Sequence, residues 1–393
     1  MSPRMTWTLI VLLAGLTFTA YLPAIRGGFV WDDERYAANS VLSEPDGLAR
    51  IWTLQPAKYS YYREFPMVYT TFWVERHLWG LDPMGFHLVN VALHLMNAIL
   101  VWLLLRQLAV PGSWLAAAVF ALHPLQVESV AWVSERKNLL CGLFFFSAAL
   151  AYLRFEDGKG KGWYWGSLGF FIGALLSKPV ATVLPVVLLL LRWARGHRVG
   201  RRDLLYVLPF FILAFGMGLF TLSVENSVHI LGPEGQQAEF RMSQLQHVLC
   251  AARSFWFYPA KLLLPVNLAF SYERWTFDPG DFSQWLWVLA TLAAATSVWR
   301  FRDRLGRKVL AGLAYYAVSI APLLGIFDLY TFRYAYVADH YQYLAGLGLI
   351  AAGVGGLTHV FRTGGVGWVR PFCARTLLGL FLKVFRQSVS GFS

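Results

Sequence analysis

The stretch from Leu204 to Leu222 reads LLYVLPFFILAFGMGLFTL and contains no charged residue. A helix needs about 20 mostly apolar residues to cross the hydrocarbon core of a bilayer, so this stretch is predicted to be a transmembrane helix. The whole chain has the same character, because 57% of its residues are hydrophobic and 14% are charged. A soluble domain carries about 25% charged residues. The composition therefore favours a membrane protein.

Similar apolar runs recur along the chain and predict an all-α multi-pass membrane protein with about ten transmembrane helices. The first run follows Arg4 and has no small-residue cleavage site, so we expect a retained helix and not a removed signal peptide. The predicted helices are Met5–Ile25, His87–Leu105, Ser113–Leu122, Leu139–Leu153, Trp163–Leu176, Val180–Trp193, Leu204–Leu222, Trp285–Val298, Val309–Phe327 and Tyr343–Val360.

The breaks between these runs predict the domain organisation. We expect one membrane domain over residues 1–362, with two long loops at 26–86 and 223–284 and an unassigned tail at 363–393. The first loop holds aromatic pieces such as Tyr59–Tyr62, which suit a membrane interface. In the second loop, an apolar segment at 248–264 is expected to be interfacial or re-entrant because charged residues and a proline interrupt it, namely Arg253, Pro259 and Lys261.

The net charge of +12 is explained by topology and does not indicate nucleic-acid binding. The basic residues cluster beside apolar runs, as the positive-inside rule predicts for cytoplasmic loops. The acidic residues gather in the opposite set of loops, which we therefore expect to be extracytoplasmic and to carry the active side. A bacterial inner membrane is favoured, with the endoplasmic reticulum membrane as the alternative. The two main basic clusters are Arg192, Arg195, Arg198, Arg201, Arg202 and Arg300, Arg302, Arg304, Arg307, Lys308.

Four polar clusters fall on the predicted extracytoplasmic side. The first is FVWDD, which contains Asp32 and Asp33, and the second is HPLQVESVAWVSERKN from His123 to Asn138. The third is Ser-Lys-Pro around Lys178, and the fourth combines Arg333 with DHYQYL. Its candidate residues are Asp339, His340 and Tyr341. Ionisable groups at a hydrocarbon boundary are costly unless they are paired or used.

Together these side chains match what a lipid-linked phosphate would require. Cations hold and neutralise phosphate, and a carboxylate can take a proton from an acceptor hydroxyl. Each cluster also has a structural alternative. The diacid can be a solvated turn or a cap, Glu128 can pair with Arg136, Lys178 can extend to the interface, and Asp339 and His340 can form a structural pair.

In this order and spacing, the four motifs resemble the membrane half of the transmembrane and tetratricopeptide-repeat O-mannosyltransferase family, over about residues 5–360. The resemblance implies a glycosyltransferase of the C-type fold that uses a polyprenyl-phosphate sugar and a protein hydroxyl. It also implies that the first outer loop carries the acidic catalytic motif, here Asp32 and Asp33. Tetratricopeptide repeats are not recognisable in this sequence, and His340 replaces a more usual arginine.

The resulting hypothesis is an inverting transfer of a sugar, such as mannose, to a hydroxyl of a protein or glycan acceptor. Asp32 is predicted to be the general base with Asp33 second, and Glu128 orients the acceptor or a cation. The phosphate is assigned to Arg136, Lys137, Lys178, Arg333 and His340, with His123, Asp339 and Tyr341 as acceptor-binding or structural support.

Cofactors and rival functions complete the expectations. No cofactor or metal site is indicated by residue spacing, although the use of a divalent metal stays open. The expected partners are the polyprenyl-phosphate donor, the acceptor and membrane lipid, without nucleic acid. The rival function is a transporter or lipid-handling scaffold, which predicts ionisable residues inside broken helices. An inactive paralogue also remains an alternative.

Overall fold

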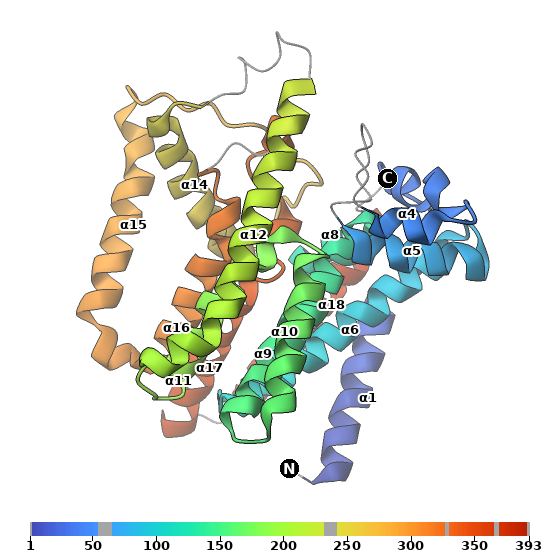
Figure 1. Cartoon of the computed structure of the whole chain (residues 1–393). Coiled ribbons are helices and arrows are strands. Elements are labelled where there is room, and N and C mark those ends of the chain that lie inside the picture. The colour runs from blue at the N-terminus through green and yellow to red at the C-terminus, as the bar shows by residue number, and fades with distance from the viewer. Residues whose placement is uncertain (1, 54–64, 232–241, 327–329, 365–368, 391–393) are drawn as a thin grey trace. The chain divides into compact units, whose positions relative to one another are not determined.

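The computed structural model describes residues 2–53, 65–231, 242–326, 330–364 and 369–390 (Figure 1). Within these ranges the chain forms α-helices and short 3-10 helices and contains no β-strand. The prediction of an all-α protein is confirmed for this part of the chain. The predicted aromatic piece Tyr59–Tyr62 lies outside the described residues.

Four of the described helical segments are long and apolar enough to cross a membrane. They are Pro3–Ala20, Pro83–Gln107, Val133–Glu156 and Arg201–Val224, and a fifth arises if Ser113–Leu122 and Pro124–Ala131, bent by 58°, form one span. Only 17% of the Arg201–Val224 window is buried inside the protein. Because such an apolar surface is not stable in water, lipid is its natural solvent. The expected total of about ten spans stays a prediction.

Two compact units make up the described chain, namely residues 1–181 with 357–393, and residues 182–356. The first unit is built around α6 (Pro83–Gln107), which packs against α7 (Ser113–Leu122) and α9 (Arg136–Glu156). α10 (Lys161–Leu175) returns along α9, and Figure 1 shows the two side by side. α6 begins where Asp82 caps the backbone N–H of Met84 (3.1 Å) and Pro83 occupies the first turn, both common at helix starts.

Buried amide side chains connect α6 to the segment before α9 and to the first turn of α9. The Asn90 amide donates to the carbonyls of Val130 (3.1 Å) and Trp132 (3.2 Å), and Asn97 donates to the Leu139 carbonyl (2.9 Å). The carbonyls of Val130 and Trp132 belong to a stretch of short helical turns, where regular helical bonds are interrupted. These bonds satisfy buried polar groups and fix the path of the chain from α8 (Val127–Ala131) into α9.

The loop predicted at 26–86 contains helices that the apolar pattern does not indicate. They are α3 (Asp33–Ala37), α4 (Gly47–Trp52) and α5 (Pro66–Trp79). α5 buries Val68, Tyr69 and Phe72, and it packs against α4, α6 and α9. This loop is therefore partly a folded layer of the first unit, and it carries the first acidic motif.

The predicted tail at 363–393 contains α18 (Val369–Ser390), which packs against α1 (Pro3–Ala20), α2 (Leu22–Ile25) and α7. The second unit contains α11 (Leu184–Ala194), α12 (Arg201–Leu231), α14 (Gln244–Leu263), α15 (Phe282–Arg300) and α16 (Arg302–Ile320). α17 (Gly346–Gly364) begins in this unit.

Helix boundaries in the second unit differ from the prediction at several places. α12 continues to Leu231, past the predicted end at Leu222, so the predicted loop at 223–284 begins inside this helix. The predicted helix Val180–Trp193 begins with the 3-10 turn Pro179–Val183, and α11 itself starts at Leu184. α14 continues through Pro259, starts at a capping box between Ser243 and Gln246, and is a helix of 20 residues. α16 ends at Ile320, before the 3-10 turn Ala321–Leu323, although the apolar run continues to Phe327. The apolar run alone could not locate this end, because composition there remains apolar while the backbone changes at Pro322.

Candidate active site

The acidic motif sits in a tight turn before α3. Trp31 has a φ of 50°, an uncommon conformation for a large L-residue that is often found at functional sites. Its indole stacks on Trp132 with ring centroids 5.7 Å apart. Just upstream, the Gly28 carbonyl contacts Nε2 of His87 on α6 at 3.1 Å. These contacts position the turn that carries Asp32 and Asp33 against the start of α9.

Asp33 is completely buried and joins two distant segments. Its Oδ1 accepts from the Ser134 backbone N–H (2.7 Å), and its Oδ2 accepts from those of Val30 (3.0 Å) and Val133 (3.4 Å). Burial raises the pKa of Asp33 to about 7, although the three backbone donors act in the opposite direction. These contacts indicate that Asp33 holds the turn and the 133–135 segment together, and they fit this structural role better than the role of a proton acceptor that faces substrate.

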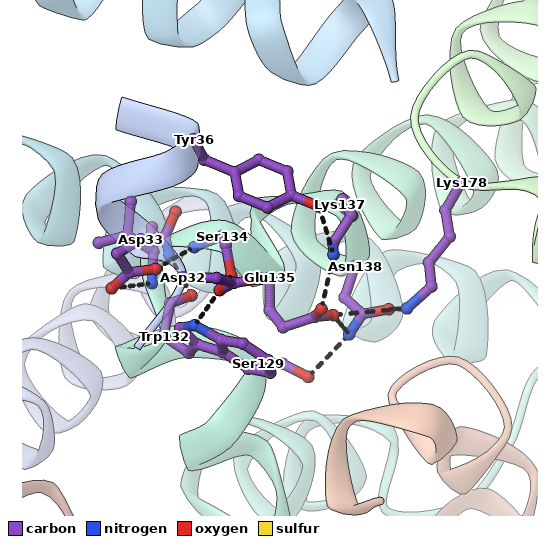
Figure 2. Close-up of polar contacts among 12 residues, drawn as sticks. Asp32, Asp33, Tyr36, Ser129, Trp132, Ser134, Glu135, Lys137, Asn138 and Lys178 are labelled. Carbon is purple, nitrogen blue, oxygen red and sulfur yellow. Dashed lines mark hydrogen bonds and ion pairs between the residues drawn. The ribbon is translucent and has the colours of Figure 1, made fainter. Parts of the chain in front are cut away.

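Asp32 is half-buried and reaches toward the same segment with one oxygen. Oδ1 accepts from the Ser134 hydroxyl (2.9 Å) and from the Trp132 indole N–H (3.1 Å), as Figure 2 shows. Two donors on one oxygen fix the carboxylate plane. A carboxylate that is both oriented and partly accessible can accept a proton from a bound hydroxyl.

Glu135 brings two lysines together beside the acidic turn (Figure 2). Its Oε1 lies 3.0 Å from the ammonium of Lys137, and its Oε2 lies 3.4 Å from that of Lys178. Asn138 donates to Oε2 of Glu135 (2.7 Å) and accepts from Lys178 (2.8 Å). The two lysine side chains are 13% and 14% exposed, whereas that of Glu135 is 3% exposed. Two cations therefore share one buried carboxylate, which leaves one net positive charge.

Aromatic residues complete the surroundings of Lys137. Its ammonium lies 5.0 Å from the ring centroid of Tyr36 on α3 and 5.5 Å from that of Phe65. It also donates to the Tyr36 hydroxyl (3.4 Å). Cation–π contacts orient an ammonium without neutralising its charge. The acidic turn is therefore connected to the two lysines in two ways. Tyr36 of α3 contacts the Lys137 ammonium, and Ser134, which binds Asp32, directly precedes Glu135 in the chain.

Arg136 occupies a different environment from its neighbours. Its side chain is 0% exposed and forms a buried ion pair with Glu75 of α5. Its guanidinium also donates to the Phe86 carbonyl (2.9 Å), to the Thr71 hydroxyl (3.3 Å) and to Asn90. The predicted contact of Arg136 with phosphate would require guanidinium N–H groups that here donate to Glu75, Asn90, Thr71 and the Phe86 carbonyl. The structure instead gives Arg136 the contacts of a support beneath the site.

Two further predicted residues lie in the same motif. His123 is 3% exposed, and its Nδ1 accepts from the Leu125 backbone N–H (3.3 Å), which caps the turn Pro124–Gln126. This agrees with a structural role. Glu128 is 6% exposed on α8. Its predicted role in orienting an acceptor stays a prediction.

The fourth motif lies in the second unit. Oδ1 of Asp339 accepts from the Tyr272 hydroxyl (2.9 Å), and the rings of His340 and Tyr341 meet edge to face, 4.7 Å apart. His340 and Arg333 are half-buried. The geometry supports Asp339 as a structural residue of its own unit. The predicted phosphate contacts of His340 and Arg333 stay predictions.

Sequence reasoning missed several residues that build the site. Glu75 has no motif around it, and it is 61 residues from its partner Arg136 in sequence. Ser134, Glu135 and Asn138 lie inside the second motif, so that motif was the available signal for them. Within the described residues, no group of three or more His, Cys, Asp or Glu side chains is arranged to hold a metal ion.

Comparison with known proteins gives consistent relatives. No family model matches the chain. The protein O-mannosyl-transferase TMTC4 of Homo sapiens is 29% identical over 43% of this chain and 26% of its own length. Tmtc1 of Drosophila melanogaster is 32% identical over 43% of this chain and 21% of its own length.

A third relative extends over more of the chain. A protein O-mannosyl-transferase of Caenorhabditis elegans is 25% identical over 67% of this chain and 39% of its own length. The matches thus span well under half the length of these curated relatives. They confirm the resemblance that the four motifs indicate. The chain is a sequence relative of the transmembrane and tetratricopeptide-repeat O-mannosyltransferases.

Proposed function

We propose that this chain is a membrane glycosyltransferase that moves a sugar, such as mannose, from a polyprenyl-phosphate donor to a hydroxyl of a protein or glycan. One observation carries the proposal. An oriented carboxylate, Asp32, is joined through the 132–135 segment to two lysines that share one carboxylate. The names of the relatives support sugar transfer to protein.

Asp32 is the proposed general base. Its Oδ1 is held by Ser134 and Trp132, so Oδ2 would receive the proton of the acceptor hydroxyl. The hydroxyl oxygen then forms a bond to the anomeric carbon of the sugar as the bond from that carbon to the phosphate oxygen breaks. The bonding electrons leave with the phosphate, and attack from the opposite face inverts the anomeric centre.

Lys137 and Lys178 are the proposed phosphate ligands. The departing phosphate gains negative charge, and fixed cations stabilise charge that develops in a transition state. Ammonium-to-phosphate hydrogen bonds are among the stronger ones in proteins. Glu135 keeps the two cations together at rest, and its single negative charge balances only one of the two ammonium charges. The buried ion pair of Arg136 with Glu75 holds the start of α9 in place beside these lysines. Asp33 holds the acidic turn in place.

The finer assignments are proposals of the same kind. We place the reaction on the extracytoplasmic side, in a bacterial inner membrane or, alternatively, the endoplasmic reticulum. The fold is proposed to be of the C-type glycosyltransferase kind, within one membrane domain over residues 1–362. A divalent metal is an optional participant. Both carboxylate oxygens of Asp33 accept backbone hydrogen bonds, whereas both hydrogen bonds to Asp32 go to Oδ1. Oδ2 of Asp32 is therefore the oxygen that would bind such a metal.

The test is a transfer assay with the purified full chain in lipid nanodiscs. A radiolabelled polyprenyl-phosphate mannose serves as donor and a serine- and threonine-rich peptide as acceptor. Wild-type transfer together with its loss in Asp32→Asn supports the proposal. Glu34→Gln, on the exposed side of α3, is the matched control and should transfer normally. Donor binding without any transfer by the wild-type chain would favour the lipid-handling scaffold.

A further inference from the structure

A small hollow lies between α6 and α9 at the ends of these helices that are far from the acidic turn. Its volume is about 250 Å³, and its lining residues are Leu103, Arg106, Gln107, Leu150 and Arg154. Both helices start at the candidate active site and run in the same direction. α9 has 21 residues, so at 1.5 Å per residue the hollow lies roughly 30 Å from the site, about the thickness of the hydrocarbon core.

The two arginines are held in place without being neutralised. The guanidinium of Arg106 lies 5.6 Å from the ring centroid of Trp102, and that of Arg154 lies 4.5 Å from that of Trp163. In the described part of the chain, neither arginine forms an ion pair. Gln107, which also lines the hollow, donates its amide to the carboxylate of Asp157 at 2.9 Å. The guanidinium N–H groups therefore keep donor capacity.

We propose that this hollow binds the phosphate of an anionic membrane phospholipid. Two like charges that line one small space repel each other, and a phosphate between them would remove that repulsion and accept several hydrogen bonds. Leu103 and Leu150 supply an apolar wall beside the cations, which suits the start of an acyl chain. Basic pockets between membrane helices are a known arrangement for anionic headgroups.

The positive-inside rule and interfacial anchoring are the simpler explanation of these arginines. Both effects act on any basic residue near a helix end, including Lys159 and Lys161 in the turn that follows Arg154. They require no cavity and no fixed guanidinium. The proposal therefore predicts that the arginines of the hollow bind lipid differently from the neighbouring lysines, whereas simple surface attraction treats both pairs alike.

The experiment measures phosphatidylglycerol binding to the purified full chain in detergent by native mass spectrometry. The variant Arg106→Gln/Arg154→Gln should bind this lipid about tenfold or more weakly, the size expected when charged hydrogen bonds are lost. Lys159→Gln/Lys161→Gln removes the same charge at the same end and should bind within about twofold of wild type. Leu103→Phe keeps both charges but fills the hollow, and it should weaken binding as well.

Three results would overturn the proposal. The first is an equal loss in the arginine and lysine variants, which indicates unspecific attraction. The second is no loss in the arginine variant. The third is binding of inorganic phosphate alone at the same concentration and with the same arginine dependence, because that would assign the hollow to a free anion. Phosphatidylcholine, tested in parallel, should bind weakly in every variant, and gel filtration verifies that each variant is folded.

Discussion

The buried pair of Arg136 and Glu75 gives the sharpest prediction about what holds the site in place. The two side chains are 0% and 5% exposed, so removing one charge leaves the other without its counter-ion in a medium of low polarity. Breaking a buried ion pair on one side costs about 3–5 kcal/mol. Glu75→Gln keeps the size and hydrogen-bonding ability of the side chain but removes the charge, and should show this cost.

A shift in melting temperature makes the cost measurable. A loss of 1 kcal/mol lowers the melting temperature of a unit of 150–250 residues by about 2–4 °C. The expected decrease for Glu75→Gln is therefore about 6–20 °C, measured by differential scanning fluorimetry in detergent. Glu34→Gln removes an exposed carboxylate from neighbouring α3 and should shift the melting temperature by no more than about 2 °C.

A double variant separates charge from packing. Glu75→Leu/Arg136→Met removes both charges and keeps most of the volume, so it should recover at least half of the loss. Full recovery is not expected, because Arg136 also donates to Asn90 and to the Phe86 carbonyl. A Glu75→Gln protein that melts at the wild-type temperature would refute the buried pair as a support of the site.

Four further predictions concern charge and sidedness. Asp32→Asn should lower transfer by about 10²–10⁴-fold and leave the melting temperature unchanged, whereas equal rates would remove it as the base. Because folding raises the pKa of Asp33 from 3.8 to about 7, the folded chain holds this proton more tightly. The contribution of Asp33 to the free energy of unfolding is largest below pH 3.8 and declines by about 4 kcal/mol as the pH rises toward 7. Asp33→Asn should reduce this dependence of the melting temperature on pH, and an unchanged pH dependence would contradict the raised pKa. Lys178→Met should weaken donor binding about ten- to a hundredfold, measured by titration, and unchanged affinity would leave Lys178 only a structural partner of Glu135 and Asn138. A cysteine at exposed Asp46 should react with an impermeant thiol reagent in intact cells while one at Arg198 should not, and equal labelling would overturn the orientation.

The sequence located the long helices well, because uninterrupted apolar runs of sufficient length have few alternatives in a membrane protein. The predicted run from His87 to Leu105, for example, lies inside α6 at Pro83–Gln107. α5 was missed because its residues mix aromatic, polar and charged side chains without a clear apolar stretch. Its helical form depends on packing against α4, α6 and α9, and packing partners are not visible in a single sequence.

For the site, the structure brings residues of the second motif against Asp32 and Asp33 of the first, but the motifs do not show how neighbouring residues divide among different surroundings. Sequence placed Arg136 and Lys137 together as phosphate ligands. In the structure these adjacent residues face different surroundings, since Arg136 meets Glu75 and Lys137 meets Glu135. Likewise, the sequence ranks Asp32 before Asp33 as the base, but it does not show that only Asp33 of the two is fully buried. Which way a side chain turns depends on the local turn geometry, and residue type does not encode it.

The short segment from Val133 to Lys137 has a consequence for how this site can change. Its successive residues reach in turn to the acidic loop, the lysine pair and the buried scaffold, through Ser134, Glu135 and Arg136. In a 3-10 or α-helical turn, one inserted residue rotates everything after it by about 100–120°. An insertion or deletion here would therefore misdirect all three connections at once, whereas the same event in an exposed loop is absorbed locally. Spacing along this segment should tolerate less variation than the identity of any one residue in it.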